Sequence, residues 1–186
     1  MLIVISGGSG SGKSAYAEEY MMKISGNCKK YYIATMQVFD EEGQTKIDRH
    51  KRMRNGKGFQ TIEQPLTIEE ALEKMRILEF RQEQKENTAI LECMSNLVSN
   101  EMFSKEDMTD YNIVIEKIIR GVEQLNKKLK HLVIVTNNVF EDGITYDKTT
   151  MEYIRVMGSI NEKLAAMADT VIEVVVGIPL ILKEGT

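Results

Sequence analysis

The sequence opens on a short apolar run that leads directly into a glycine-rich loop. Leu2–Ile5 is rich in β-branched residues, and residues 7–14 then read G-x-x-x-x-G-K-S. Glycines allow successive backbone N–H groups to face phosphate oxygens, which bulkier residues would obstruct. A flexible loop that matches by chance is the alternative. The order of strand, loop and helix favours a loop that binds the phosphates of a nucleotide.

The pattern assigns a role to each part of the loop. Lys13 supplies a mobile cation for the β- and γ-phosphates, and the Ser14 hydroxyl suits Mg²⁺. The helix that begins there adds the positive end of its dipole to the same anion site. The residues expected to bind the nucleotide are Gly7, Gly8, Ser9, Gly10, Ser11, Gly12, Lys13 and Ser14.

The composition is that of an ordinary globular protein. The 186 residues are 42% hydrophobic and 28% charged, and this length suits a single domain over residues 1–186. The net charge of −4 disfavours nucleic-acid binding over the whole surface. Two cysteines without a secretion signal indicate a reducing compartment, so we expect a cytoplasmic protein. No stretch has the length and apolarity of a membrane span.

Apolar strand patterns alternate with helix patterns along the chain. The expected strands cover residues 2–5, 31–34, 59–62, 88–91, 131–135 and 171–176, with an edge strand over 178–182. The expected helices cover residues 13–24, 42–54, 67–84, 95–103, 110–129 and 149–168. Thr67 and Glu70 form a capping-box pattern at the third of these helices. The short, apolar strands predict an α/β fold, a single P-loop NTPase-like domain whose mostly parallel sheet is flanked by helices on both faces.

Ligands of such sheets bind beyond the carboxyl ends of the strands. This rule brings the glycine-rich loop together with Thr35, Glu92 and Thr136, each of which follows a strand pattern. Glu92 comes after three apolar residues, like the carboxylate that supports Mg²⁺ in phosphoryl-transfer enzymes. Glu92 could also merely end its strand, but a charge beside a buried strand needs a partner, which favours a metal or nucleotide role.

His50 is the second candidate for chemistry. Of the two histidines, His131 stands at the start of a strand, away from the expected site, and is expected to be structural. His50 lies among lysines and arginines, and a neutral imidazole, with a reference pKa of about 6.5, is a competent nucleophile toward phosphorus. From chemistry alone, a lone histidine on a charged helix is more often solvated than functional.

The order of these motifs resembles the bifunctional adenosylcobinamide kinase/adenosylcobinamide-phosphate guanylyltransferase family of cobalamin biosynthesis. The resemblance covers nearly the whole chain. Besides the glycine-rich loop, the matching segments are 32–35 with Gln37, 40–42, 46–51, 61–66, 91–93, 96–100, 135–137 and 158–168.

The resemblance implies two uses of a nucleotide. In the kinase step, a γ-phosphate passes to the aminopropanol hydroxyl of adenosylcobinamide. In the transferase step, the family's histidine, which matches His50, attacks the α-phosphorus of GTP, and pyrophosphate leaves. The phosphate of adenosylcobinamide phosphate then displaces the histidine and yields adenosylcobinamide-GDP. Lys13 and Mg²⁺ would hold the pyrophosphate, so one loop would serve both reactions.

The resemblance also implies a set of contacts and partners. GTP, ATP and Mg²⁺ would be bound, with Ser14 and Glu92 at the metal. The partners would be the corrinoid substrate and further copies of the chain in a homotrimer, without nucleic acid. The nucleotide contacts beyond the loop would be Thr35, Met36, Gln37, Lys51, Arg52, Met53, Arg54, Glu63 and Glu92.

Four positions depart from the family pattern. Gly10 and Lys46 stand where arginine is usual, and Asn138 and Phe140 stand in the region where an acid and a glycine are usual. Two alternatives therefore stay open. One is a P-loop kinase for another small hydroxyl substrate, without guanylyltransferase activity. The other is a nucleotide-binding regulatory protein derived from this family. A covalent histidine would distinguish the bifunctional enzyme from a plain kinase.

Overall fold

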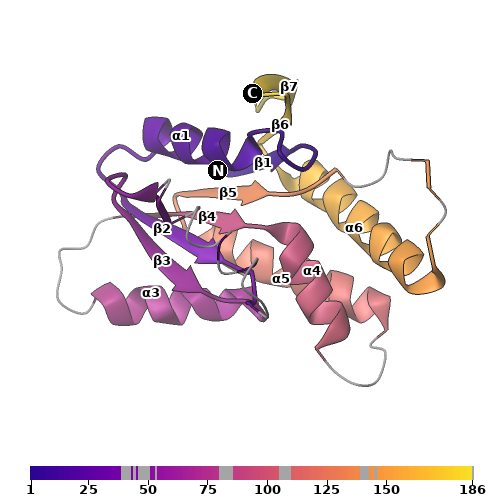
Figure 1. Ribbon diagram of the computed structural model, residues 1–186. Helices are drawn as coiled ribbons and strands as arrows, with labels where there is room; N and C mark the ends of the chain where they lie inside the picture. Colours follow the sequence, from indigo (N-terminus) through magenta and orange to yellow (C-terminus); the bar gives the residue numbers. More distant parts are fainter. Residues whose placement is uncertain are drawn as a thin grey trace.

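The computed structural model describes most of the chain. The described residues are 1–38, 43, 45, 51–52, 54–79, 86–104, 110–138, 143–144 and 146–185, without the side chains of residues 77 and 79. In this part of the chain, one seven-stranded sheet has the order β3-β2-β4-β5-β1-β6-β7 (Figure 1). The strands are β1 (Leu2–Ser6), β2 (Lys29–Ala34), β3 (Phe59–Glu63), β4 (Asn87–Glu92), β5 (His131–Val135), β6 (Thr170–Val175) and β7 (Ile178–Lys183).

The sheet is parallel except at one edge. Strands β1 to β6 run parallel to their neighbours, and β7 pairs antiparallel with β6. The register places Ala34 opposite Glu92, and Glu92 opposite Val135. The carboxyl ends of β2, β4 and β5 therefore meet at one edge of the sheet. Both the mostly parallel sheet and the edge strand after Gly177 are confirmed.

Helices cover both faces of the sheet (Figure 1). The helices are α1 (Lys13–Ile24), the 3₁₀ helix η1 (Ile68–Glu70), α3 (Ala71–Glu79), α4 (Met94–Phe103), α5 (Tyr111–Lys128) and α6 (Lys148–Met167). Side chains of β1 alternate between two buried clusters. Ile3 and Ile5 pack with residues of α1, whereas Leu2 and Val4 pack with residues of η1, α3, α4, α5 and α6. An apolar strand without polar alternation is thus explained by burial on both sides.

The helices follow the spacing of their apolar residues. In α1 the buried Ala17 and Met21 are four residues apart, which places them on one face. Helix α6 begins where the Asp147 carboxylate accepts hydrogen bonds from the backbone N–H groups of Thr149 and Thr150, at 2.9 and 3.1 Å. None of the described helices has the length and apolarity needed to cross a membrane.

The capping box predicted at Thr67 is wrong. Thr67 has a φ of 49° and no side-chain cap bond, and the chain first forms η1 before α3 begins at Ala71. Its backbone N–H instead donates to Glu101 Oε1 at 2.7 Å, and its hydroxyl accepts from Lys117 at 3.2 Å. Tertiary contacts with α4 and α5 thus replace the local cap. The predicted end of this helix, residues 80–84, lies outside the described residues.

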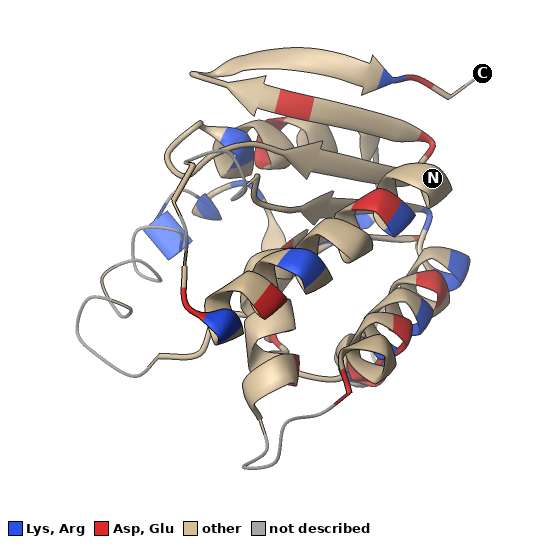
Figure 2. Cartoon of the chain, turned by 90° about the vertical axis from the view of Figure 1, so that its right-hand side faces the viewer, with Lys and Arg blue, Asp and Glu red and all other residues tan. Residues whose placement is uncertain are grey.

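Most other boundaries differ from the predictions by one or two residues. The second strand begins at Lys29 rather than Tyr31, and α4 begins at Met94 rather than Ser95. The predicted helix 42–54 is only partly described, and residues 43, 45, 51, 52 and 54 in it are helical. Lys46, His50, Met53 and Phe140 lie outside the described residues. Figure 2 shows that acidic and basic residues are interspersed along the visible helices, whereas β7 carries a charge only near its end.

Candidate nucleotide site

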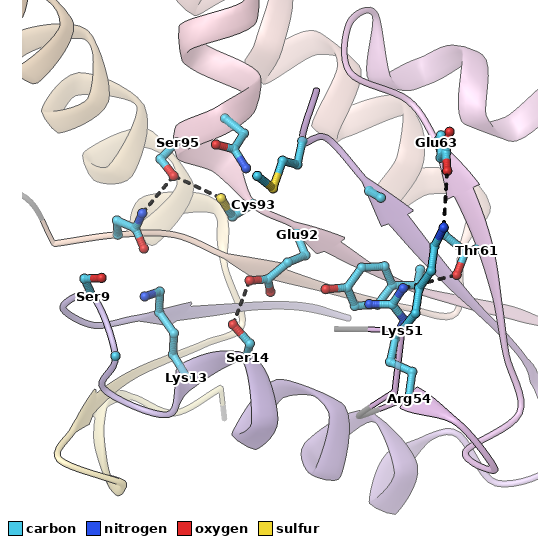
Figure 3. Close-up of a pocket in the computed structure, with 16 residues that line it drawn as sticks. Ser9, Lys13, Ser14, Lys51, Arg54, Thr61, Glu63, Glu92, Cys93 and Ser95 are labelled. Atoms are coloured by element: carbon cyan, nitrogen blue, oxygen red, sulfur yellow. Dashed lines mark hydrogen bonds and ion pairs between the residues drawn. The ribbon is translucent and has the colours of Figure 1, made fainter. Parts of the chain in front are cut away.

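A pocket of about 360 Å³ lies at the edge where the parallel strands end. Figure 3 shows Ser9, Lys13 and Ser14 on one side of it, Lys51 and Arg54 on the opposite side, and Glu92 between them. Its walls come from the phosphate loop, the ends of β2, β3 and β4, the starts of α1 and α4, the segment that carries Lys51 and Arg54, and the residues that follow β5. The lining residues are Ser9, Gly10, Lys13, Ser14, Tyr32, Ala34, Met36, Lys51, Arg54, Thr61, Glu63, Glu92, Cys93, Ser95, Asn96 and Asn137.

The loop between β1 and α1 depends on glycine at several positions. Gly10 and Gly12 have φ values of 73° and 91°, a region that side chains disfavour. At Gly7 the limit is space, because an added Cβ would lie 2.6 Å from the backbone oxygen of Val174. Helix α1 has no side-chain cap, so the backbone N–H groups of its first turn can serve a bound phosphate.

Lys13 is buried at the start of α1, and its ammonium donates to the Gly8 carbonyl at 2.9 Å. Burial lowers the pKa of Lys13, and the nearby Glu92 carboxylate opposes that shift. A phosphate oxygen would offer the ammonium a full negative charge in place of a carbonyl. The side chain is therefore positioned to exchange its loop contact for a ligand contact.

Ser14 and Glu92 form a pair at the centre of the pocket. The Ser14 hydroxyl donates to Glu92 Oε1 at 2.7 Å, and Glu92 Oε2 is buried without a hydrogen-bond partner among the described residues. Burial raises the pKa of Glu92 to about 7, against the opposing effects of the Ser14 hydrogen bond and Lys13. A buried carboxylate oxygen without a donor is costly unless a cation or ligand reaches it.

This pair fits Mg²⁺. Hydroxyl and carboxylate oxygens are ligands that Mg²⁺ prefers, and it typically takes the rest of its ligands from water and substrate phosphates. Among the described residues there is no cluster of three or more His, Cys, Asp and Glu side chains that could hold a metal by themselves. A single carboxylate beside a phosphate loop agrees with a cation that arrives with its nucleotide.

Arg54 supplies a second cationic group across the pocket. Its guanidinium carbon lies 3.5 Å from the centre of the Tyr32 ring, and Nη2 donates to the Thr61 hydroxyl at 3.3 Å. Nη1 is buried, and no residue in the described part of the chain accepts a hydrogen bond from it. Stacking on Tyr32 holds the guanidinium plane, which leaves Nη1 available for an anion.

A partly buried ion pair links the two sides of the site. Lys57 lies in the turn after Arg54, and its ammonium is 2.6 Å from Glu18 of α1. The side chain of Glu18 is only 1% exposed. The segment that carries Lys51 and Arg54 is thereby tied to the helix that follows the phosphate loop.

The predicted site residues fall into three groups. Those in the pocket are Ser9, Gly10, Lys13, Ser14, Met36, Lys51, Arg54, Glu63 and Glu92. Gly7, Gly8, Ser11, Gly12, Thr35, Gln37 and Arg52 do not line it. The Thr35 hydroxyl both accepts from and donates to the Cys93 backbone at 2.8 Å, so it joins β2 to the end of β4. His50 and Met53 lie outside the described residues.

The structure adds pocket residues that the sequence prediction missed. Asn96 stands in the first turn of α4, and Asn137 follows the end of β5. Both come just after strands, so the rule that ligands bind beyond strand ends could have found them. Tyr32 gave no such signal, because an aromatic residue inside an apolar strand predicts core packing.

Comparison with known proteins identifies the family. The family model described as "Cobinamide kinase / cobinamide phosphate guanyltransferase" matches residues 3–182. The chain belongs to this family. It is thus an enzyme of a cobinamide kinase and guanyltransferase family that serves cobalamin biosynthesis, and the resemblance noted in the sequence is confirmed.

Two curated relatives span the whole chain. The bifunctional adenosylcobalamin biosynthesis protein CobU of Escherichia coli strain K12 is 28% identical over 195 residues, which cover 98% of this chain and 100% of that protein. The protein of the same name from Salmonella typhimurium strain LT2 is 26% identical over 200 residues and has the same coverage.

Solved structures show the fold. An ATPase domain of known structure has a TM-score of 0.54 at 10% identity, covering 92% of this chain and 68% of that one. The flagellar accessory protein FlaH of Methanocaldococcus jannaschii has a TM-score of 0.50 at 15% identity, covering 99% and 78%. At these identities the likeness concerns the fold alone, and it confirms the predicted P-loop NTPase-like architecture.

Proposed function

We propose that the protein phosphorylates adenosylcobinamide and then transfers GMP from GTP to the phosphorylated product through a covalent bond to His50. One observation carries the proposal. The phosphate loop with its Ser14–Glu92 pair faces Lys51 and Arg54 across one pocket. His50 directly precedes Lys51 in the sequence, so a nucleophile would lie next to the cationic side of the site.

Different residues of the pocket would bind different phosphates of a nucleoside triphosphate. Lys13 and the loop N–H groups bind the β- and γ-phosphates, and Arg54 Nη1 is left to bind oxygens of the α-phosphate. Ser14 and Glu92 would hold Mg²⁺, which, when bound, neutralises charge on the phosphate chain. In the kinase step, the acceptor hydroxyl oxygen bonds to the γ-phosphorus, its proton leaves to solvent, and the bond to the bridging oxygen breaks.

The transferase step uses the α-phosphate of a second nucleoside triphosphate, bound in the same pocket. A ring nitrogen of His50 forms a bond to the α-phosphorus, and pyrophosphate leaves with the electron pair of the broken P–O bond. An oxygen of the acceptor phosphate then bonds to the α-phosphorus, the P–N bond breaks, and the imidazole regains its electron pair. Lys13 stabilises the pyrophosphate that leaves in the first half of this step. In the kinase step, it stabilises the nucleoside diphosphate that leaves.

We further propose that ATP and GTP serve the two steps with Mg²⁺, and that the enzyme works in the cytoplasm as a homotrimer. Family resemblance supports the trimer. The apolar side chains of β7 give a second reason, because Ile178, Leu180, Ile181 and Leu182 are all exposed at the sheet edge. Sedimentation velocity tests this assembly, and a purely monomeric species at micromolar concentration would refute it.

The covalent step is tested by labelling. Incubation with GTP labelled at the α-phosphate, with Mg²⁺, should leave an acid-labile and base-stable label on the protein, as expected of a phosphoramidate. His50→Ala should prevent the label, and Lys13→Ala should prevent it by removing the phosphate contact. A label that persists in His50→Ala refutes His50 as the nucleophile. Kinase turnover without any label would support the plain kinase, and absence of both activities would support the regulatory protein.

A further inference from the structure

A second cavity, of about 320 Å³, adjoins the nucleotide pocket. One wall is a face of α4 that carries Asn96, Ser99 and Phe103, whose spacing of three and four residues aligns them along the helix. The facing wall is the first turns of α6, with Thr149, Thr150 and Tyr153. Ser95, Asn96 and Asn137 line both cavities, so the two spaces share a polar wall.

The two cavities differ in charge. Lys13, Lys51, Arg54, Glu63 and Glu92 line the nucleotide pocket, as a phosphate chain and its cation require. The second cavity is lined by hydroxyl, amide and aromatic side chains, with no Lys, Arg, His, Asp or Glu among its described lining residues. It is therefore suited to an uncharged polar ligand rather than to a second phosphate group.

Some polar side chains of the second cavity are held by hydrogen bonds within the protein, and others are available to bind a ligand. The Asn137 amide donates to the Ser95 hydroxyl at 2.8 Å, and the Tyr153 hydroxyl donates to the Ser95 carbonyl at 3.3 Å. These bonds join α4, α6 and the end of β5 at the base of the cavity. By contrast, the side chains of Asn96 and Ser99 have no hydrogen-bond partner within the described part of the chain. They can bind a ligand without losing a protein contact.

We propose that this second cavity binds an amide-bearing edge of the corrinoid acceptor and directs its aminopropanol arm past Asn96 into the nucleotide pocket. The inference rests on the proposed function, which supplies the acceptor. A corrinoid carries neutral acetamide and propionamide groups around its ring, and these pair with amide and hydroxyl side chains. Phe103 at the rim is 52% exposed and offers an apolar surface to the macrocycle. The cavity holds only one edge of so large a molecule, so the ring stays at its mouth.

The test is an absorbance titration of the protein with cobinamide, a coloured corrinoid. Ser99→Leu fills the cavity and should raise the Kd for cobinamide at least about tenfold, equivalent to about 1.4 kcal/mol. Ser99→Ala removes the proposed hydrogen bond from the Ser99 hydroxyl to cobinamide and should raise the Kd for cobinamide about threefold to fivefold. Ser104→Leu is the matched control, because Ser104 is exposed at the end of the same helix, outside the cavity, and should leave the Kd unchanged.

Labelling with GTP separates this inference from the proposed function, because the first half of the transfer needs no acceptor. Ser99→Leu should keep the label on His50 while cobinamide binding weakens. A Kd for cobinamide within about twofold of wild type in both Ser99 variants overturns the inference. The inference is also overturned if the variants weaken GTP binding instead of cobinamide binding. That result would assign the cavity to the nucleotide base. If Ser99→Leu does not fold, Ser99→Ala alone decides between these results. Loss of the label in wild type would refute the covalent step and leave the cobinamide titration valid.

Discussion

The buried ion pair between Glu18 and Lys57 should fix the cationic side of the pocket relative to the phosphate loop. The two charges are 2.6 Å apart, and the side chains of Glu18 and Lys57 are 1% and 30% exposed. At an effective dielectric constant of about 20, their attraction is about 6 kcal/mol. This attraction offsets a desolvation cost of several kcal/mol, most of it for the buried carboxylate.

Lys57→Met removes the attraction and leaves the desolvation cost of Glu18. We expect the free energy of unfolding to fall by about 3 kcal/mol, the lower end of the range for breaking a buried pair, because Lys57 is partly exposed. The KM for GTP should also rise, since Arg54 lies only three residues before Lys57. The double variant Glu18→Leu/Lys57→Met should recover most of the stability, because apolar residues often replace a buried pair at little cost.

Urea denaturation measures the effect as a shift of the midpoint at constant slope. Lys23→Met is the control, because Lys23 is exposed near the end of the same helix α1 and should change stability by less than about 0.5 kcal/mol. A loss below about 0.5 kcal/mol in Lys57→Met would refute the role of the pair. A double variant as unstable as Lys57→Met would refute the desolvation argument.

Three further predictions concern the pocket. Gly7→Ala should lower the free energy of unfolding by about 2 kcal/mol, because the added Cβ would lie 2.6 Å from a backbone oxygen of β6. Gly8→Ala should be neutral in the same urea assay, because no atom of the described residues lies within 4 Å of the added Cβ, and equal effects of the two variants would contradict the argument. Without Mg²⁺ and nucleotide, stability should fall as pH rises from about 4.5 to about 7, because the unfolded chain releases the Glu92 proton near 4.5 and the folded protein near 7. Glu92→Gln should reduce this fall, and an unchanged difference between urea midpoints at pH 5 and pH 8 would contradict the raised pKa. Arg54→Met should raise the KM for GTP about tenfold, or about 1.4 kcal/mol, by removing the charge stacked on Tyr32, and an unchanged KM would show that Nη1 does not bind the nucleotide.

The sequence predicted the fold well where the structure depends on local patterns. The four apolar residues that follow His131 predicted β5 at its observed bounds, His131–Val135, because a strand buried on both faces has no polar alternation. The phosphate loop was equally recognisable in the sequence, because conformations that other residues disfavour require glycine at fixed positions. Thr67 shows where such reasoning stops. Its local pattern predicts a cap, but Glu101 and Lys117, far along the chain, determine its conformation.

The candidate site was predictable only in part. Glu92 was recognisable because a carboxylate at the end of a buried strand requires a partner, and Ser14 is that partner. The stacking of Arg54 on Tyr32 depends on a contact between a helical segment and the middle of a strand, which no spacing reveals. The Glu18–Lys57 pair was missed for the same reason, since each residue alone suggests a solvated surface charge.

The central claim is that GMP is bound covalently to His50 before it is transferred to the acceptor. The most direct measurement is a single-turnover chase. Enzyme labelled from α-phosphate-labelled GTP is separated from free nucleotide and then mixed with adenosylcobinamide phosphate. We expect the label to move completely to adenosylcobinamide-GDP, at least as fast as steady-state turnover. A label that stays on the protein while unlabelled GTP yields product at the full rate would contradict the account, because GMP would then pass directly between the two substrates.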